Sequence, residues 1–179
     1  MDADGGWVLP VSWAVLGLTI VGCSLRAHRD DRARKVGIAA VSLLWFGAGA
    51  LANLAMLAAG NTYTRFASGS EIPYVRDTWE SLVVPHHHVF IGLLIAGEAL
   101  AGILVLVPGR VREVVLLVLT AFNATLVVFG WGFAIWAVPL VVGLSLLYRA
   151  ERLRTRPRRP SGGASSGHRR SPRSRVPSP

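Results

Sequence analysis

Long apolar stretches separated by short polar gaps constrain this chain more than any other feature of its sequence. The stretches are Trp7 to Leu25, Val36 to Ala59, Val89 to Val107 and Val114 to Tyr148. A helix needs about 20 apolar residues to cross the roughly 30 Å of hydrocarbon in a bilayer, at about 1.5 Å per residue. Each of the first three stretches therefore predicts one spanning helix, and the chain is predicted to be an all-α, polytopic transmembrane bundle.

The fourth apolar stretch is too long for a single crossing. As one helix its 35 residues would extend about 52 Å, which is more than tilting can accommodate. The segment Gly130 to Gly132 lies near its midpoint, where two glycines relax the backbone and Trp131 suits the headgroup level. The stretch therefore predicts a hairpin of two spans, each about 17 residues long, which brings the predicted total to five.

The distribution of basic residues predicts the orientation of these spans. Basic residues are frequent in the gaps 26–35 and 108–113 and beyond residue 148, whereas the gap 60–88 carries two basic and three acidic residues. Under the positive-inside rule the first three regions are cytoplasmic and 60–88 is external. We therefore expect the amino terminus outside and the carboxyl terminus in the cytoplasm. The preference for arginine, with a single lysine, indicates a GC-rich bacterial genome and hence a bacterial cytoplasmic membrane.

Three segments are predicted from these patterns. Residues 1–35 form an amino-terminal spanning helix and a basic loop, 36–148 form a four-helix core, and 149–179 form a disordered cytoplasmic tail rich in Arg, Pro and Ser. The tail carries the excess charge of +9, and no groove-reading motif accompanies it, so nucleic acid is not an expected partner. Its first arginines are expected to contact anionic lipid headgroups: Arg149, Arg152, Arg154 and Arg156.

The single cysteine, Cys23, allows two interpretations. The segment Ile20 to Cys23 resembles the box cleaved in bacterial lipoproteins, and lipidation of Cys23 would remove the first span. The acidic, non-basic amino terminus argues against a cleaved leader, so a plain buried cysteine is the favoured interpretation. With no second cysteine, the chain cannot form an internal disulfide.

The external gap predicts a short helix followed by a histidine run. Asp77 to Glu80 has the spacing of a capping box, which predicts a helix from Thr78 to Val84 that ends before Pro85. Three consecutive histidines follow: His86, His87 and His88. Consecutive helical residues point about 100° apart, so they converge poorly on one ion. Metal or haem ligation and a polar collar at the start of the third span remain the two interpretations.

Glu98 is the outstanding polar residue inside a predicted span. An acidic residue at mid-span costs roughly 3 kcal/mol and usually faces the bundle interior. Small residues one turn later, Ala101 and Gly102, mark that face as one where another helix approaches. Counting depth along the spans places Asn123 level with Glu98 and Asn53 slightly further outside. We expect an uncharged carboxyl, acting either as a proton-responsive or ligand-anchoring site or as a hydrogen-bonding link between helices.

Residues 36–148 resemble the DoxX-like family of small bacterial membrane proteins. The resemblance rests on small residues that end a span, an external loop with aromatic and proline residues, a Gly- and Glu-containing span and a short-turn hairpin: Gly47 to Ala50; Tyr63, Phe66 and Pro73; Ile91 to Gly102; Phe129 to Gly132 with Pro139 and Leu140. It implies a four-helix membrane core with both ends cytoplasmic. The first helix, Trp7 to Leu25, would then be an addition in front of that core.

The resemblance implies a non-catalytic accessory subunit of a membrane complex, linked to redox or quinone chemistry, with a membrane-protein partner or a second copy of itself. A quinone or a lipid would bind near Glu98. The alternative is a small proton-coupled transporter or carrier component that uses Glu98 as its protonatable group. The sequence shows no haem, flavin or metal motif, which leaves a direct electron-transfer role unsupported.

Overall fold

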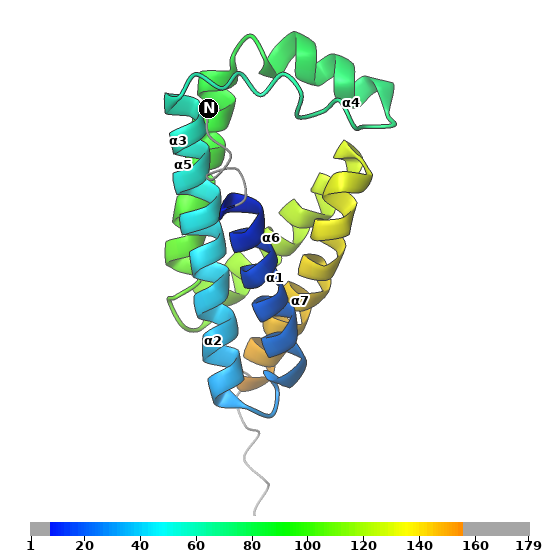
Figure 1. Ribbon diagram of the computed structural model, residues 1–179. Coiled ribbons are helices and arrows are strands. Elements are labelled where there is room, and N and C mark those ends of the chain that lie inside the picture. Colours follow the sequence, from blue (N-terminus) through cyan, green and yellow to red (C-terminus); the bar gives the residue numbers. More distant parts are fainter. Residues whose placement is uncertain (1–7, 156–179) are drawn as a thin grey trace, which may run out of the picture.

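The computed structural model describes residues 8–155, and all regular structure within that range is helical (Figure 1). Predictions for the amino terminus, for Arg156 and for the rest of the tail lie outside the described residues. Five helical segments are long and apolar enough to cross a membrane: Val8–Arg26, Asp31–Ala58, His87–Leu104, Arg110–Phe129 and Trp131–Thr155. The prediction of an all-α bundle with five spans is confirmed.

The second span is one helical rod with a π-helical centre. It runs through α2 (Asp31–Ser42), η1 (Leu43–Leu51) and α3 (Ala52–Ala58). Asp30 caps its start, because the Asp30 carboxylate accepts a hydrogen bond of 2.8 Å from the amide of Arg32. Such π-helical stretches are rare and are found frequently at functional sites.

The segment between the second and third spans contains a short helix, α4 (Pro73–Thr78), continued by a π-turn, η2 (Trp79–Val83). The predicted helix thus begins earlier than expected, and the capping-box interpretation was wrong. Pro73 occupies the first helical position, where its fixed φ and missing N–H carry no penalty, and Asp77 lies inside the helix. The predicted end before Pro85 is confirmed.

The third span is α5 (His87–Leu104), and the fourth and fifth form the predicted hairpin. The fourth consists of α6 (Arg110–Leu126) and a 3-10 turn, η3 (Val127–Phe129), and the fifth is α7 (Trp131–Thr155). Gly130 makes the turn with φ of +112°, a conformation that favours glycine. The predicted turn is confirmed, although it is tighter than expected because Trp131 already begins α7.

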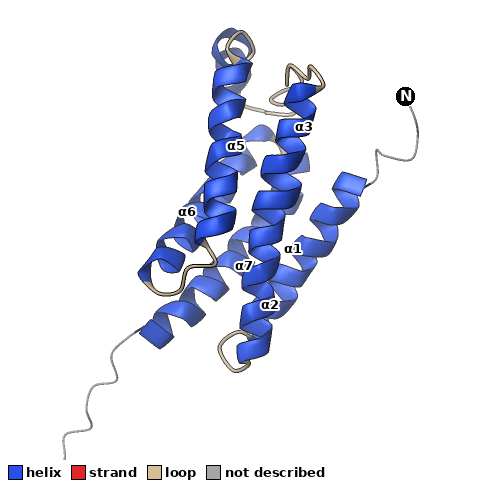
Figure 2. Cartoon of the chain, turned by 90° about the vertical axis from the view of Figure 1, so that its left-hand side faces the viewer, coloured by secondary structure: helices blue, strands red, loops and turns tan. Residues whose placement is uncertain are grey.

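The spans pack as two groups joined by α1 (Val8–Arg26). The rod of α2, η1 and α3 packs against α5, α6 packs against α7, and α1 lies between α2 and α7 (Figures 1 and 2). The two groups diverge toward the segment 59–86, which lies across that end (Figure 1). We call this the loop end, and we call the opposite end, with the α1–α2 turn, the α5–α6 turn and the end of α7, the basic end.

Aromatic packing attaches the 59–86 segment to the α6–α7 turn. Phe66 stacks on Trp79 with ring centroids 4.7 Å apart and meets Phe129 edge-on at 5.0 Å. The Ser70 hydroxyl donates a hydrogen bond of 2.6 Å to the carbonyl oxygen of Val128. Offset and edge-on aromatic pairs each contribute roughly 0.5–1.5 kcal/mol of stabilisation beyond that from burial. The 59–86 segment is therefore packed against the bundle.

The distribution of apolar side chains is that of a membrane protein. A central cluster is buried across the spans: Ile20, Val41, Leu44, Trp45, Leu116, Leu144 and Leu147. Large apolar side chains also cover the outer faces of the spans, among them Val15, Leu18, Leu93, Leu117 and Val142. In water such continuous apolar surface would drive association, whereas in lipid it is solvated. The chain is therefore a multi-pass helical membrane protein, and α1 contributes to its core through Ile20.

Candidate functional site

The Glu98 carboxyl lies at the interface of α5 with the second span. Its side chain is 7% exposed, and its Oε2 accepts a hydrogen bond of 2.9 Å from Asn53 Nδ2. Gly49 makes this approach possible, because a Cβ there would lie 3.0 Å from Glu98 Cδ. The hydrogen bond agrees with the depth count, which places Asn53 slightly further outside than Glu98. Gly49 belongs to η1, so the π-helical stretch directly faces the carboxyl.

A chain of polar contacts connects this carboxyl to the loop end. The Tyr63 hydroxyl donates a hydrogen bond of 3.0 Å to the backbone carbonyl of Asn53 and lies 3.3 Å from Asn53 Oδ1. Trp79 Nε1 donates a hydrogen bond of 2.9 Å to the carbonyl oxygen of Tyr63. Burial raises the pKa of the Tyr63 hydroxyl above its ordinary value, which favours the protonated form that donates the hydrogen bond to Asn53.

Tyr63 adopts an unfavourable backbone conformation at this position. Its φ is +56°, in a region that non-glycine residues rarely adopt, and its amide donates a hydrogen bond of 2.8 Å to Asn61 Oδ1. Strained backbone persists only where the surroundings enforce it, and it occurs frequently at functional sites. The sequence pattern indicates only that Tyr63 belongs to an external loop, and it gives no sign of the contact with Asn53.

A cavity of about 220 Å³ adjoins Glu98 between η1, α5 and α6. Apart from the Glu98 carboxyl, its walls are apolar or made of glycine, with lining residues Trp45, Leu93, Leu94, Gly97, Glu98, Ala101, Val118, Leu119 and Phe122. A space of this kind suits an apolar group that carries one polar atom, because the carboxyl provides a single anchoring point among hydrocarbon walls.

Asn123 does not join Glu98 in this arrangement. Its side chain is 1% exposed, and its Nδ2 donates a hydrogen bond of 2.7 Å to the carbonyl oxygen of Leu119 in its own helix. Among the hydrogen bonds within residues 8–155, none joins Asn123 to Glu98. Level placement along two helices was thus insufficient, because Asn123 lines a pocket between α6, α1 and α7, whereas Glu98 lines the cavity between α6, α5 and η1.

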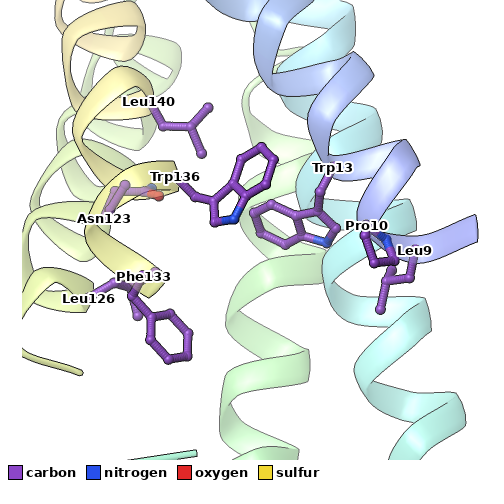
Figure 3. A pocket seen from close by; sticks show the side chains of 9 residues that line it. Leu9, Pro10, Trp13, Asn123, Leu126, Phe133, Trp136 and Leu140 are labelled. Atoms are coloured by element: carbon purple, nitrogen blue, oxygen red, sulfur yellow. The ribbon is translucent and has the colours of Figure 1, made fainter. Parts of the chain in front are cut away.

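Asn123 instead lines a second pocket, of about 300 Å³, between α1, α6 and α7 (Figure 3). Trp13 and Trp136 face one another across it, and Trp13 Nε1 donates a hydrogen bond of 3.0 Å to the carbonyl oxygen of Ala48. The remaining lining is apolar: Leu9, Pro10, Leu126, Phe133, Ala137 and Leu140. The structure therefore divides the predicted site residues between two cavities, Glu98 and Asn53 at one and Asn123 at the other.

The basic end contains a buried ion-pair cluster among residues that the sequence pattern did not single out. Glu151 pairs with Arg34 through Oε1 and with Arg112 through Oε2, the latter at 3.3 Å. Arg112 also donates hydrogen bonds of 2.8 Å to the carbonyl oxygens of Val105 and Leu106, just beyond the end of α5. These contacts tie α2, α5, α6 and α7 together at one end.

A sequence signal for this cluster existed. Glu151 follows Leu140, Leu144 and Leu147 at spacings of four, three and four residues, which places it on the buried face of α7. The helix indeed continues to Thr155, past the expected end of the membrane core at Tyr148, so the first residues of the predicted tail are helical. The charge count along the chain groups Glu151 with the tail and carries no information on its burial.

The arginines expected at lipid headgroups lie in different environments. Arg149 is exposed on α7. Arg152 donates a hydrogen bond of 3.1 Å to the Tyr148 hydroxyl, and its guanidinium lies 5.9 Å from the centre of that ring. Arg154 pairs with Asp31 at 2.8 Å, and Arg156 is not among the described residues.

The histidine run lies at the start of α5. His87 and His88 are its first residues, their rings are 4.2 Å apart, and His87 Nδ1 lies 2.9 Å from the carbonyl oxygen of Val84. Within the described range no group of three or more His, Cys, Asp or Glu side chains is arranged to hold a metal ion. Metal or haem ligation by His86, His87 and His88 therefore remains a prediction.

Comparison of the chain with protein-family models, with curated proteins and with solved structures gives no match.

Proposed function

We propose that this membrane protein is a non-catalytic accessory subunit that holds an apolar molecule, a quinone or a lipid, against Glu98 within a larger membrane complex. The resemblance to the DoxX-like family and the link to quinone chemistry belong to this proposal. So does the bacterial cytoplasmic membrane as its location, with the basic end in the cytoplasm.

One observation carries the proposal. Glu98 is a buried mid-span carboxyl that both accepts a hydrogen bond from Asn53 and forms the polar point of a 220 Å³ cavity. A purely structural carboxyl needs a partner but no adjoining space. Two residues that line the cavity, Leu93 on α5 and Val118 on α6, are also exposed on the surface of the bundle. A molecule dissolved in the bilayer therefore has a route to the carboxyl.

The test is to identify what co-purifies with the protein. The organic extract of the full-length protein in lipid nanodiscs is analysed by mass spectrometry for wild type, Glu98→Gln, Glu98→Leu and Leu100→Ala. Leu100 is the matched control, because it is exposed on the same helix and does not line the cavity. We expect wild type, the Gln variant and the control to retain one quinone or lipid species, and Glu98→Leu to lose at least nine-tenths of it. Identical extracts from all four would contradict the proposal.

A second candidate function is a proton-coupled carrier component, and the contacts from Glu98 through Asn53 to Tyr63 favour it. They connect the carboxyl to the segment at the loop end, from which a proton would enter. In liposomes this function predicts substrate or proton flux that Glu98→Gln abolishes while the variant stays folded, because an amide cannot titrate. Equal flux for wild type and Glu98→Gln would eliminate it.

A further inference from the structure

A hollow between α1 and α7 at the basic end combines apolar and basic side chains. Its volume is about 320 Å³, and its lining consists of Ser24, Leu25, His28, Leu146, Arg149, Ala150 and Leu153. A second hollow adjoins it on the other side of Arg149 and is lined by Tyr148, Arg149, Arg152 and Leu153. We call the two together the basic groove, with Arg149 and Leu153 as the ridge that both hollows share.

The basic groove lies where the spans change from apolar to polar. Leu25 and Leu146 belong to the last apolar turns of α1 and α7, and His28 and Arg149 follow them directly on the polar side. In a bilayer this boundary is the level of phosphate groups, with acyl chains on one side and water on the other. The groove thus offers hydrocarbon contacts and positive charge at the two depths where a phospholipid needs them.

Arg149 has no internal partner that would neutralise it. Within residues 8–155 its guanidinium makes no ion pair or hydrogen bond, whereas Arg34 and Arg112 are committed to Glu151, and Arg154 to Asp31. Arg152 is held over Tyr148 and so remains beside Arg149. At this end Glu151 pairs with Arg34 and Arg112, Asp31 pairs with Arg34, Lys35 and Arg154, and Asp30 caps the start of α2. None of these carboxylates pairs with Arg149, so the groove presents its positive charge outward.

We propose that the basic groove binds the headgroup of one anionic phospholipid. The phosphate oxygens accept hydrogen bonds from Arg149 and His28, and the first part of an acyl chain lies along Leu25 and Leu146. Guanidinium groups suit this role because their planar donors match phosphate oxygens in pairs. The site is separate from Glu98 and does not depend on the function proposed for it.

Native mass spectrometry of the full-length protein tests this proposal by counting bound lipid. The protein is titrated with phosphatidylglycerol, with phosphatidylcholine and with inorganic phosphate. The variants are Arg149→Gln and, as matched control, Arg110→Gln, an exposed arginine at the same end that lines neither hollow. We expect one tightly retained phosphatidylglycerol, weakened about fivefold or more by Arg149→Gln and unchanged by Arg110→Gln. Phosphatidylcholine should bind more weakly, and millimolar phosphate should not displace the lipid.

Three results would overturn the proposal. Equal weakening by Arg149→Gln and Arg110→Gln would show charge attraction without a site. Equal binding of the two lipids would remove the role of headgroup charge, and displacement by inorganic phosphate would indicate an anion site that does not recognise lipid. Both substitutions are at exposed positions, and a shared unfolding midpoint with wild type checks that the variants are folded.

Discussion

The buried ion-pair cluster at the basic end predicts that Glu151→Ala strongly destabilises the bundle. The side chain of Glu151 is 4% exposed, and those of Arg34 and Arg112 are 10% and 11% exposed. Removing the carboxylate leaves Arg112 buried without a counter-charge and leaves Arg34 with Asp31 as its only ion-pair partner, at 2.8 Å. Breaking a buried pair in this way typically costs about 3–5 kcal/mol.

The geometry of the cluster supports a value in that range. At the 3.3 Å that separates Arg112 Nη1 from Glu151 Oε2, the gross attraction is roughly 5 kcal/mol for an effective dielectric constant of about 20. Loss of hydration in the folded protein offsets much of this attraction, so the pair itself adds little net stability. Glu151→Ala lowers the free energy of unfolding because the arginines stay buried and do not regain the hydration that they lost on folding.

Reversible unfolding by sodium dodecyl sulfate, followed by tryptophan fluorescence, measures this loss. Glu80→Ala is the control, since Glu80 is exposed and has no ion pair within residues 8–155. Combining Glu151→Ala with Arg112→Ala should cost less than the two single losses added together, because the pair is coupled. A Glu151→Ala variant as stable as Glu80→Ala would refute the cluster.

Three further substitutions test the loop end and the helix contacts in the same unfolding assay. Gly130→Ala should lower the free energy of unfolding by about 1–3 kcal/mol, because the φ of Gly130 is +112° and the new Cβ would lie 2.1 Å from a backbone oxygen of the 59–86 segment. Gly132→Ala is its control and should leave the free energy of unfolding unchanged, because there is open space around Gly132. Gly102→Ala should lower the free energy of unfolding by about 1–3 kcal/mol, because the new Cβ would lie 2.8 Å from the backbone of η1. Gly97→Ala is its control, because a Cβ at Gly97 meets nothing within 4 Å. Tyr63→Phe should cost about 0.5–1.5 kcal/mol through its lost hydrogen bond and should speed proteolysis of the 59–86 segment.

Hydrophobic length predicted the spans well because the bilayer imposes one simple physical demand. A stretch of about 20 apolar residues has few alternatives to a crossing helix, and the double-length stretch had to turn near Gly130. The predicted helix boundaries were wrong where interactions other than apolar length determine where a helix starts or ends. Pro73 started a helix that the capping-box spacing had placed later, and α7 continued past Tyr148 because Glu151 finds partners on other helices.

The candidate site was predictable in part for a related reason. Burial cost alone drew attention to Glu98, and depth counting brought Asn53 within reach. Depth does not say which way a side chain points, and so it wrongly suggested Asn123 as a neighbour. The contact of Tyr63 with Asn53 was not predicted, because it depends on a backbone conformation with φ of +56° that no sequence pattern here indicates.

Carbodiimide labelling measures most directly whether Glu98 is a ligand site open to the bilayer. An apolar carbodiimide modifies uncharged carboxyl groups that it reaches from lipid, and peptide mass spectrometry locates the adduct. We predict modification at Glu98 and none at Glu151, which is held in ion pairs. We also predict that a short-chain quinone, or the lipid recovered from the protein, suppresses the Glu98 adduct in proportion to its concentration. An unmodified Glu98, or an adduct that neither molecule suppresses, would contradict this account.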